Sequence, residues 1–447
     1  MLIKFGIYSG YYPAINVREE LRLFVNSQGV KSSFMMRCIR LLQKGSSNST
    51  LPQSTEPQHS SPRSFNTEMI LLSSALEHDA TVPHDKIFSI YPLLQFCGMD
   101  LPQINYDQPF EMLCEKVTRC WFDSTRNLNI ILLATRLPSN DSCMPSWVPD
   151  WRNRQSALEY RLKVDKTDVG NSRGVPRKND RASNGSSLDE SPKTITGELH
   201  LRGLSLGTIS RVLFCDVPDD VSARAWNHGT LGVFRTWCCA VNDSSFYSTR
   251  QESQDALLLT MCAYFDYDWK KPMFRVVFGL LYDLMFYPDC RLLDSAQAKK
   301  AYEKILEVER VSGRLHFEAY EELVTFLSTF WIENRSPDLG HLSDLHSEFS
   351  MGRVFKHIYS SLTALAYRIK RLRNHSLLIT DSCYGLAPST AREGDEVYLL
   401  KGLDIPVVLR PSGENYSFVG PCSYIHGVME GQKWPEDESE LQDIVLV

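Results

Sequence analysis

Apolar residues recur every three or four positions over residues 67–165 and 216–375, as they do in amphipathic helices. The same spacing within residues 1–44 predicts an N-terminal helical segment. Residues 193–215 and 376–436 instead carry short β-branched and aromatic runs between glycines and prolines, which is typical of strands. We therefore predict an α+β fold that is mostly helical. It should contain a short β hairpin at 193–215 and a small antiparallel β module at the C-terminus.

Polar tracts separate these parts of the chain. Residues 45–66 are nearly devoid of large apolar side chains and cannot offset the entropy of ordering, so a disordered linker is expected there. Residues 166–192 have the same character and predict a disordered loop. The acidic residues 437–447 are expected to form a frayed tail.

Composition argues against several classes of protein. The 447 residues carry a formal net charge of -6, which is too mild to predict nucleic acid or a membrane surface as a partner. The most apolar stretch, residues 272–288, is interrupted by Arg275 and Asp283, so it predicts a buried helix rather than a membrane span. The 12 cysteines form no CxxC pair, which predicts reduced thiols of a cytoplasmic protein. No glycine-rich phosphate loop or metal-ligand spacing is found, so no cofactor or metal is expected.

Two parts of the chain contain motifs in a distinctive order. The first contains HDKIFSIYPLLQFCG (84–98), INYDQPFEMLCEKVTRCW (104–121) and LNIILLATRLPSNDSCMPSWVPDW (128–151). The second, residues 377–431, contains YGLAP, GDEVYLL, PVVLR and YIHGVMEG in that order. In this order and at this separation, the motifs resemble those of the fungal heterokaryon-incompatibility (HET) family.

The resemblance singles out residues that fit the family motifs, and we expect structural roles for them. In the first part these are Asp85, Lys86, Pro145, Trp147, Pro149, Asp150 and Trp151. In the second part these are Tyr384, Gly385, Leu386, Pro388, Gly394, Asp395, Arg410, His426 and Gly427.

The resemblance also implies a function. The HET family acts in fungal self/non-self recognition, in which a TIR-like N-terminal domain is thought to trigger programmed cell death. The W-[LI]-D-x-[LI]-C-I-N-Q-like motif of that domain is not found before residue 85. The resemblance therefore implies a truncated, non-enzymatic family protein that acts through a protein partner. An inactive relic is an alternative.

The sequence GLSLG (203–207) raises an enzymatic alternative. It fits G-x-S-x-G, the nucleophile elbow of α/β-hydrolases, which needs a strand, a strained turn and then a helix. The residues after Ser205 have a strand-like pattern, so a structural serine in a strand is favoured. The alternative is a serine hydrolase that uses Ser205, with His426 as the candidate base. For His426 a hydrogen bond within the sheet is favoured over a catalytic role, because no partner group can be named.

Three further groups of residues have simple structural explanations. His341 and His346 are five residues apart, whereas two metal ligands on one helix face are four apart, so a solvated surface is favoured. Trp147 and Trp151 are expected to pack within the fold rather than form a ligand shelf. Cations near a helix C-terminus complement the helix dipole, which is favoured over phosphate binding for Arg368, Lys370, Arg371 and Arg373.

Overall fold

A computed structural model describes much of the chain after residue 79. The described residues are 80–96, 99–134, 144–152, 181–188, 190–195, 197–217, 228–243, 246–262, 272–286, 289, 295–311, 313–333, 351–373 and 375–447. The predicted N-terminal helical segment (1–44) and linker (45–66) lie outside this set. The chain divides into two compact units, which are Met1–Ile104 with Trp151–Arg154, and Asn105–Asp150 with Gln155–Val447.

In the first unit, two short helices follow one another. Helix α4 (Pro83–Phe88) has proline at its start, where no backbone N–H is needed, and Asp85 in its first turn, where a carboxylate complements the helix dipole. Helix α5 (Tyr91–Phe96) follows, with Pro92 in its first turn. The rings of Phe88 and Tyr91 meet edge to face with centroids 5.2 Å apart, and both are buried.

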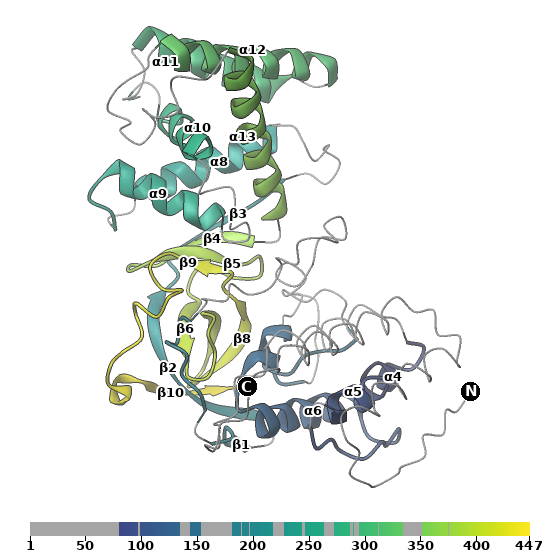
Figure 1. The fold of residues 1–447 in the computed structure, drawn as a ribbon. Coiled ribbons are helices and arrows are strands. Elements are labelled where there is room, and N and C mark those ends of the chain that lie inside the picture. The colour runs from purple at the N-terminus through teal and green to yellow at the C-terminus, as the bar shows by residue number, and fades with distance from the viewer. Residues whose placement is uncertain are drawn as a thin grey trace, which may run out of the picture. The chain divides into compact units, whose positions relative to one another are not determined.

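A closed barrel is the centre of the second unit (Figure 1). Its sheet has the order β1-β2-β10-β8-β7-β6, and β6 pairs back onto β2. All pairings are antiparallel except the one between β10 and β8. The strands are β1 (Thr194–Ile195), β2 (Glu198–Thr208), β6 (Glu396–Leu400), β7 (Val407–Ser412), β8 (Asn415–Pro421) and β10 (Gln442–Leu446).

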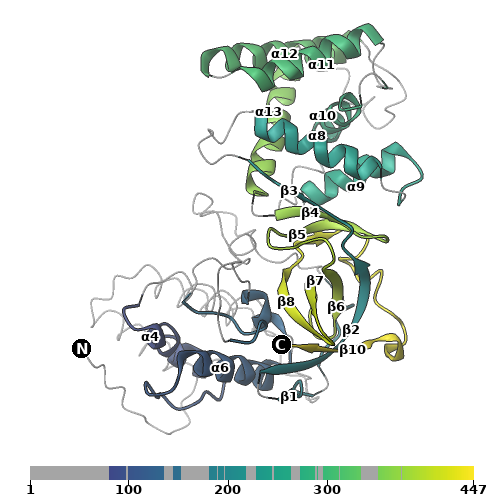
Figure 2. The ribbon, with the colours of Figure 1, turned by 180° about the vertical axis from the view of Figure 1, so that it is seen from behind.

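A second sheet lies between the barrel and the large helical layer, as both ribbon views show (Figures 1 and 2). Its order is β3-β4-β5-β9. Successive side chains of a strand point to opposite faces. Accordingly, Leu377 packs into the helical core while its neighbour Leu378 packs into the barrel core. Strands β4 and β5 are therefore buried on both faces. Its strands are β3 (Arg211–Phe214), β4 (His375–Ile379), β5 (Tyr384–Pro388) and β9 (Tyr424–Ile425).

The helical layer packs its apolar faces into one core. A capping box between Thr249 and Glu252 starts α9 and satisfies backbone N–H groups that a helix start leaves without partners. The predicted buried helix at 272–288 is confirmed as α10. Its Asp283 is buried and accepts a hydrogen bond from Arg250 Nη1 at 2.9 Å. The helices are α8 (His228–Asn242), α9 (Arg250–Met261), α10 (Pro272–Leu284), α11 (Ser295–Arg310), α12 (Gly313–Glu333) and α13 (Met351–Arg371).

The α+β class and the helical majority are confirmed. Within the described part of the chain, no helix is both long and apolar enough to cross a membrane. The second unit also contains α6 (Phe110–Thr125) and the 3-10 helix η1 (Asn129–Leu133). Helix α6 buries Leu113, Val117 and Trp121 on one face, at the three-and-four spacing seen in the sequence.

The prediction that residues 193–215 form one hairpin is wrong. Strands β1 and β2 form a small hairpin, but β2 and β3 belong to different sheets. The chain crosses from barrel to sheet at Ile209, whose N–H donates to Asp395 O at 2.7 Å. A β-bulge between Ser205 and Gly207 accompanies this change of direction. The sequence shows only that β2 and β3 are adjacent, which suggests a hairpin. Their partners in the structure, β6 and β10 for β2 and β4 for β3, are more than 150 residues away along the chain.

The prediction of a frayed acidic tail at residues 437–447 is also wrong. Residues 442–446 form β10, which pairs with five consecutive residues of β2. Ile444 and Leu446 are buried because alternate residues of a strand share one face. The acidic run ends at Asp443, and this short apolar alternation after it is sufficient to close the barrel.

Part of the predicted disordered loop at 166–192 is ordered in the structure. Residues 181–188 form turns that lie on the barrel, where Ala182 N donates to Asp404 O at 3.1 Å. Ser183 Oγ donates to a carboxylate oxygen of the same aspartate at 3.0 Å. Ala182 and Ser183 are buried, so small side chains and hydrogen bonds hold a segment whose only large apolar side chain is that of Leu188. Residues 166–180 lie outside the described set.

Candidate functional site

An aromatic cluster surrounds His426 where β5 and β9 meet the helical layer. We call Tyr247, Tyr384, Tyr424 and His426 the His426 cluster. The ring of Tyr384 stacks on the imidazole with centroids 6.2 Å apart and an interplanar angle of 14°. Tyr247 meets both rings edge to face, at 5.7 Å from Tyr384 and 5.8 Å from His426. Tyr424 Oη lies 3.4 Å from His426 Nδ1.

A glycine makes this arrangement sterically possible. Gly385 pairs with Ile425 across the sheet, and a Cβ atom on Gly385 would lie 2.1 Å from Tyr424 O. The strands can approach this closely only without a side chain at that position. His426 N donates to Tyr384 O at 3.1 Å. Gly427 then turns the chain with a φ of +71°, which is unfavourable for other residues.

The electrostatics of the cluster favour neutral groups. Burial lowers the pKa of His426, and the Asp255 carboxylate opposes this effect. Burial raises the pKa of Tyr247 to about 12 and holds the pKa of Tyr384 far above its ordinary range. At neutral pH the imidazole of His426 is therefore uncharged, as are the phenols of Tyr247 and Tyr384 beside it. Such a group of rings is suited to packing the sheet against the helices.

A charged clamp lies where the barrel meets the loop after β5. Arg410 on β7 donates from Nε to Asp395 Oδ1 at 2.7 Å and from Nη2 to Oδ2 at 2.9 Å. The same Nη2 donates to Thr390 O at 3.0 Å, and Arg392 N donates to Asp395 Oδ2 at 2.9 Å. The carboxylate raises the pKa of Arg410. Bidentate pairs of this kind fix geometry as well as charge, so the clamp orders the loop that begins at Pro388.

Gly394 precedes the clamp with a φ of +90°. This left-handed conformation turns the chain so that Asp395 can face both Arg392 and Arg410. Leu386, two residues before Pro388 on β5, packs into the helical core. The motif residues of the second part thus meet in two places, the His426 cluster and the Arg410–Asp395 clamp.

The motif residues of the first part tie α6 to the barrel. Ser146 Oγ accepts from Phe418 N at 2.8 Å and donates to the backbone carbonyl of Val447. Trp147 Nε1 donates to Gly197 O at 3.3 Å, and the Arg119 guanidinium lies 5.6 Å from the Trp147 ring centroid.

The other residues of that motif have varied surroundings. Pro145 O accepts from Val148 N at 3.1 Å, which closes a turn, and Pro149 is buried while Asp150 is half-buried. Trp151 is fully buried and belongs to the first unit, as do Asp85 and the buried Lys86.

Ser205 lies in the middle of β2 opposite Tyr398 of β6. Its Oγ accepts a hydrogen bond from Gly207 N at 3.2 Å. The strand continues to Thr208, so the strand, turn and helix of a nucleophile elbow are not formed there. The prediction of a serine within a strand is confirmed. This local geometry contradicts the nucleophile elbow on which the Ser205 hydrolase depended.

The basic residues predicted near the end of α13 include Arg368 and Lys370, which are at least partly buried. Arg368 is 1% exposed, donates to Cys262 Sγ at 3.1 Å and lies 4.5 Å from the Phe274 ring centroid. Its guanidinium therefore serves the helical core and cannot reach a phosphate in solution. Burial lowers the pKa of Lys370. His341 and His346 lie outside the described residues, and no cluster of metal-ligating side chains occurs among the described ones.

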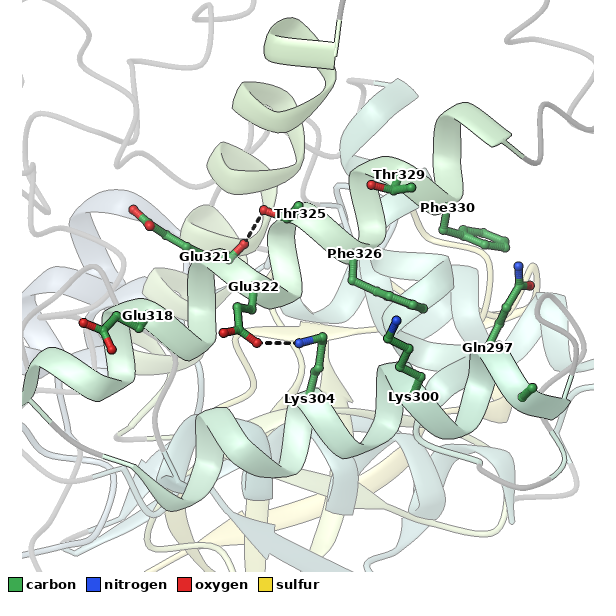
Figure 3. Close-up of a pocket in the computed structure, with 11 residues that line it drawn as sticks. Gln297, Lys300, Lys304, Glu318, Glu321, Glu322, Thr325, Phe326, Thr329 and Phe330 are labelled. Atoms are coloured by element: carbon green, nitrogen blue, oxygen red, sulfur yellow. Dashed lines mark hydrogen bonds and ion pairs between the residues drawn. The ribbon is translucent and has the colours of Figure 1, made fainter.

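Sequence analysis missed a groove between α11 and α12, shown in Figure 3. Its volume is about 860 Å³, and it is lined by charged and aromatic side chains of both helices. Hydrophobic periodicity shows which face of each helix is buried but not how far apart two helices lie. In the sequence, only Phe326 and Phe330, which are four residues apart and follow Glu321 and Glu322, could have drawn attention to it.

Comparisons with known proteins show which proteins this chain is similar to. A family model described as the Het-6 beta-barrel domain matches residues 310–447. A curated relative, heterokaryon incompatibility protein 6, OR allele, of Neurospora crassa, is 22% identical over 318 residues. The match covers 69% of this chain and 40% of the relative, so the chain spans well under half of the relative's length. No solved structure matches the chain significantly. The matched range begins after β2, so the barrel is closed by a strand from outside that range.

Proposed function

We propose that the chain belongs to the heterokaryon-incompatibility family and serves in fungal self/non-self recognition by binding a protein partner in the cytoplasm. The name of the Neurospora relative includes both heterokaryon incompatibility and an allele. Distinguishing one variant of a protein from another requires a difference in binding free energy, which a surface can supply without a chemical reaction.

The observation that carries this proposal is that the motif residues contact other parts of the fold and hold it together. The Arg410–Asp395 pair orders a loop, and Ser146 holds the end of β10 to the barrel. His426 packs among tyrosines, and burial lowers its pKa. These residues hold the fold together, which leaves the binding of a partner to other side chains on the surface.

A heterokaryon growth assay tests the proposal. The chain is expressed in Neurospora crassa strains, which are then paired with strains of the same or a different incompatibility background. We expect the chain to change the growth rate in only some genetic pairings, with cell death scored by a vital dye in the same hyphae. The same effect on all pairings, or on none, would contradict recognition. Loss of the effect on Ser205→Ala substitution would instead favour the hydrolase.

A further inference from the structure

Strand β1 lies beside α6 in both ribbon views (Figures 1 and 2). We call residues 190–195, which include this strand, the β1 segment. Hydrogen bonds from the β1 segment and from the residues that flank it reach α6 or its C-cap. The pairs are Leu188 N with Arg126 O (3.4 Å), Ser191 Oγ with Asp123 Oδ1, and Gly197 N with Glu115 Oε1 (3.3 Å). The helix positions fall from 126 to 115 as the other positions rise from 188 to 197, so the β1 segment runs antiparallel to α6.

Ser191 is placed where a modifying enzyme can reach it. It is half-buried and lies outside any helix or strand, and its neighbours Glu190 and Lys193 are exposed. Pro192 follows directly and restricts Ser191 to an extended backbone. A serine followed by proline in an accessible, extended stretch is the substrate pattern of proline-directed protein kinases. The local sequence and the local structure therefore both fit this class of enzyme.

A phosphate on Ser191 would remove the contact with Asp123. The hydroxyl that donates to the carboxylate becomes a phosphate ester, which carries about −1.5 to −2 charges at pH 7 and has no proton to donate. Asp123 lies in the last turn of α6, where the helix dipole adds negative charge, and Glu190 adds a further carboxylate. Arg126 and Lys193 are exposed, and solvent-exposed pairs with them offset only part of this repulsion.

We propose that Ser191 is a phosphorylation site for a proline-directed protein kinase, and that its phosphate releases the β1 segment from α6. In the transfer, a bond forms between Ser191 Oγ and the γ-phosphorus of ATP while the bond from that phosphorus to the β–γ bridging oxygen breaks. ADP leaves with the bonding electron pair, and the hydroxyl proton passes to the general base of the kinase. The inference goes beyond the proposed function and does not rest on it.

Incubation of the full chain with a purified proline-directed kinase and ATP tests the modification. Mass spectrometry of proteolytic peptides locates each phosphate. We expect phosphate on Ser191 in the unsubstituted chain, at a rate that falls to background in Pro192→Ala. Ser187 is also exposed but is not followed by proline, so Ser187→Ala is the matched control and should leave the rate at Ser191 unchanged. No phosphate on Ser191, or equal rates with and without Pro192, would overturn the proposal.

Hydrogen exchange of the phosphorylated chain tests the release. The amides of Leu188 and Gly197 donate to Arg126 and to Glu115, so their exchange rates report whether the chain stays on α6. We expect phosphorylation to speed their exchange about threefold, the size typical of an exposed charged contact. The amides of β7 and β8 should exchange as before.

Variants of the chain assign that change to the two side chains. Ser191→Ala treated with the same kinase corrects for phosphate on Ser61 and Ser336, which also precede proline. In Asp123→Asn the side chain is uncharged and its amide can donate to the phosphate, so phosphorylation should no longer speed exchange. Unchanged exchange in the phosphorylated chain, or the same increase in Asp123→Asn, would overturn the proposal.

Discussion

Replacing Gly385 by alanine should break the closest contact between β5 and β9. The new Cβ would lie 2.1 Å from Tyr424 O and 2.8 Å from Ile425 Cα. Both are backbone atoms, so no side-chain rotation can relieve the overlap. Strand β9 must move away from β5, which also separates the rings that pack around His426.

The size of the effect follows from the contacts that are lost. Forcing an extra carbon into a packed site costs typically about 1–3 kcal/mol. Displacing β9 also strains the hydrogen bonds from His426 N to Tyr384 O (3.1 Å) and from Ser423 N to Leu386 O (2.8 Å). Each such bond contributes about 0.5–1.5 kcal/mol. We therefore expect Gly385→Ala to lower the free energy of unfolding by about 2–6 kcal/mol.

Thermal unfolding followed by near-UV circular dichroism measures this effect, because that signal reports tyrosine packing. Gly232→Ala is the matched control. Gly232 lies in α8, and a Cβ there would meet nothing within 4 Å. Alanine within a helix is more favourable than glycine by about 1 kcal/mol, so this variant should be slightly stabilised. If Gly385→Ala unfolds within about 1 kcal/mol of the unsubstituted protein, the steric argument is refuted.

Three further substitutions test other parts of the structure. Arg410→Lys should lower stability by about 1–3 kcal/mol in chemical denaturation, because one ammonium cannot replace the two-point contact with Asp395; no change would contradict the clamp. Ser146→Ala should cost about 1–2 kcal/mol in the same assay by removing the hydrogen bonds to Phe418 N and the Val447 carbonyl, and an unaltered midpoint would count against them. The folded pKa of His426 lies below its ordinary value of 6.5, so its contribution to stability is present above about pH 6.5 and is lost as pH falls through the folded pKa. His426→Gln should flatten that acidic slope of the unfolding midpoint, and an unchanged slope would exclude His426 as its source.

Local pattern was sufficient to predict much of the fold. The buried helix α10 followed from an apolar stretch too interrupted for a membrane, and the C-terminal strands followed from β-branched runs between turn residues. Pairing between distant strands could not be predicted in this way. Strand β2 pairs with β6 and β10, which follow it by about 190 and 240 residues. The sequence of β2 alone does not indicate which strands it pairs with.

The candidate site shows the same division. The motif resemblance singled out Asp395 and Arg410 but not the bidentate contact between them, which depends on the turn at Gly394. It singled out Tyr384 and His426 but missed Tyr247, which reaches the cluster from the connection between α8 and α9. The α11–α12 groove depends on the distance between two helices, which single-sequence periodicity does not encode.

The most direct test of recognition by binding is the growth rate of paired Neurospora crassa strains that express the unsubstituted chain or its Ser205→Ala variant. We predict that the unsubstituted chain changes growth in only some genetic pairings and that Ser205→Ala leaves this change unaltered. A change that is the same in all pairings, or that disappears with Ser205→Ala, would contradict recognition by binding, and its loss with Ser205→Ala would point to chemistry at the serine.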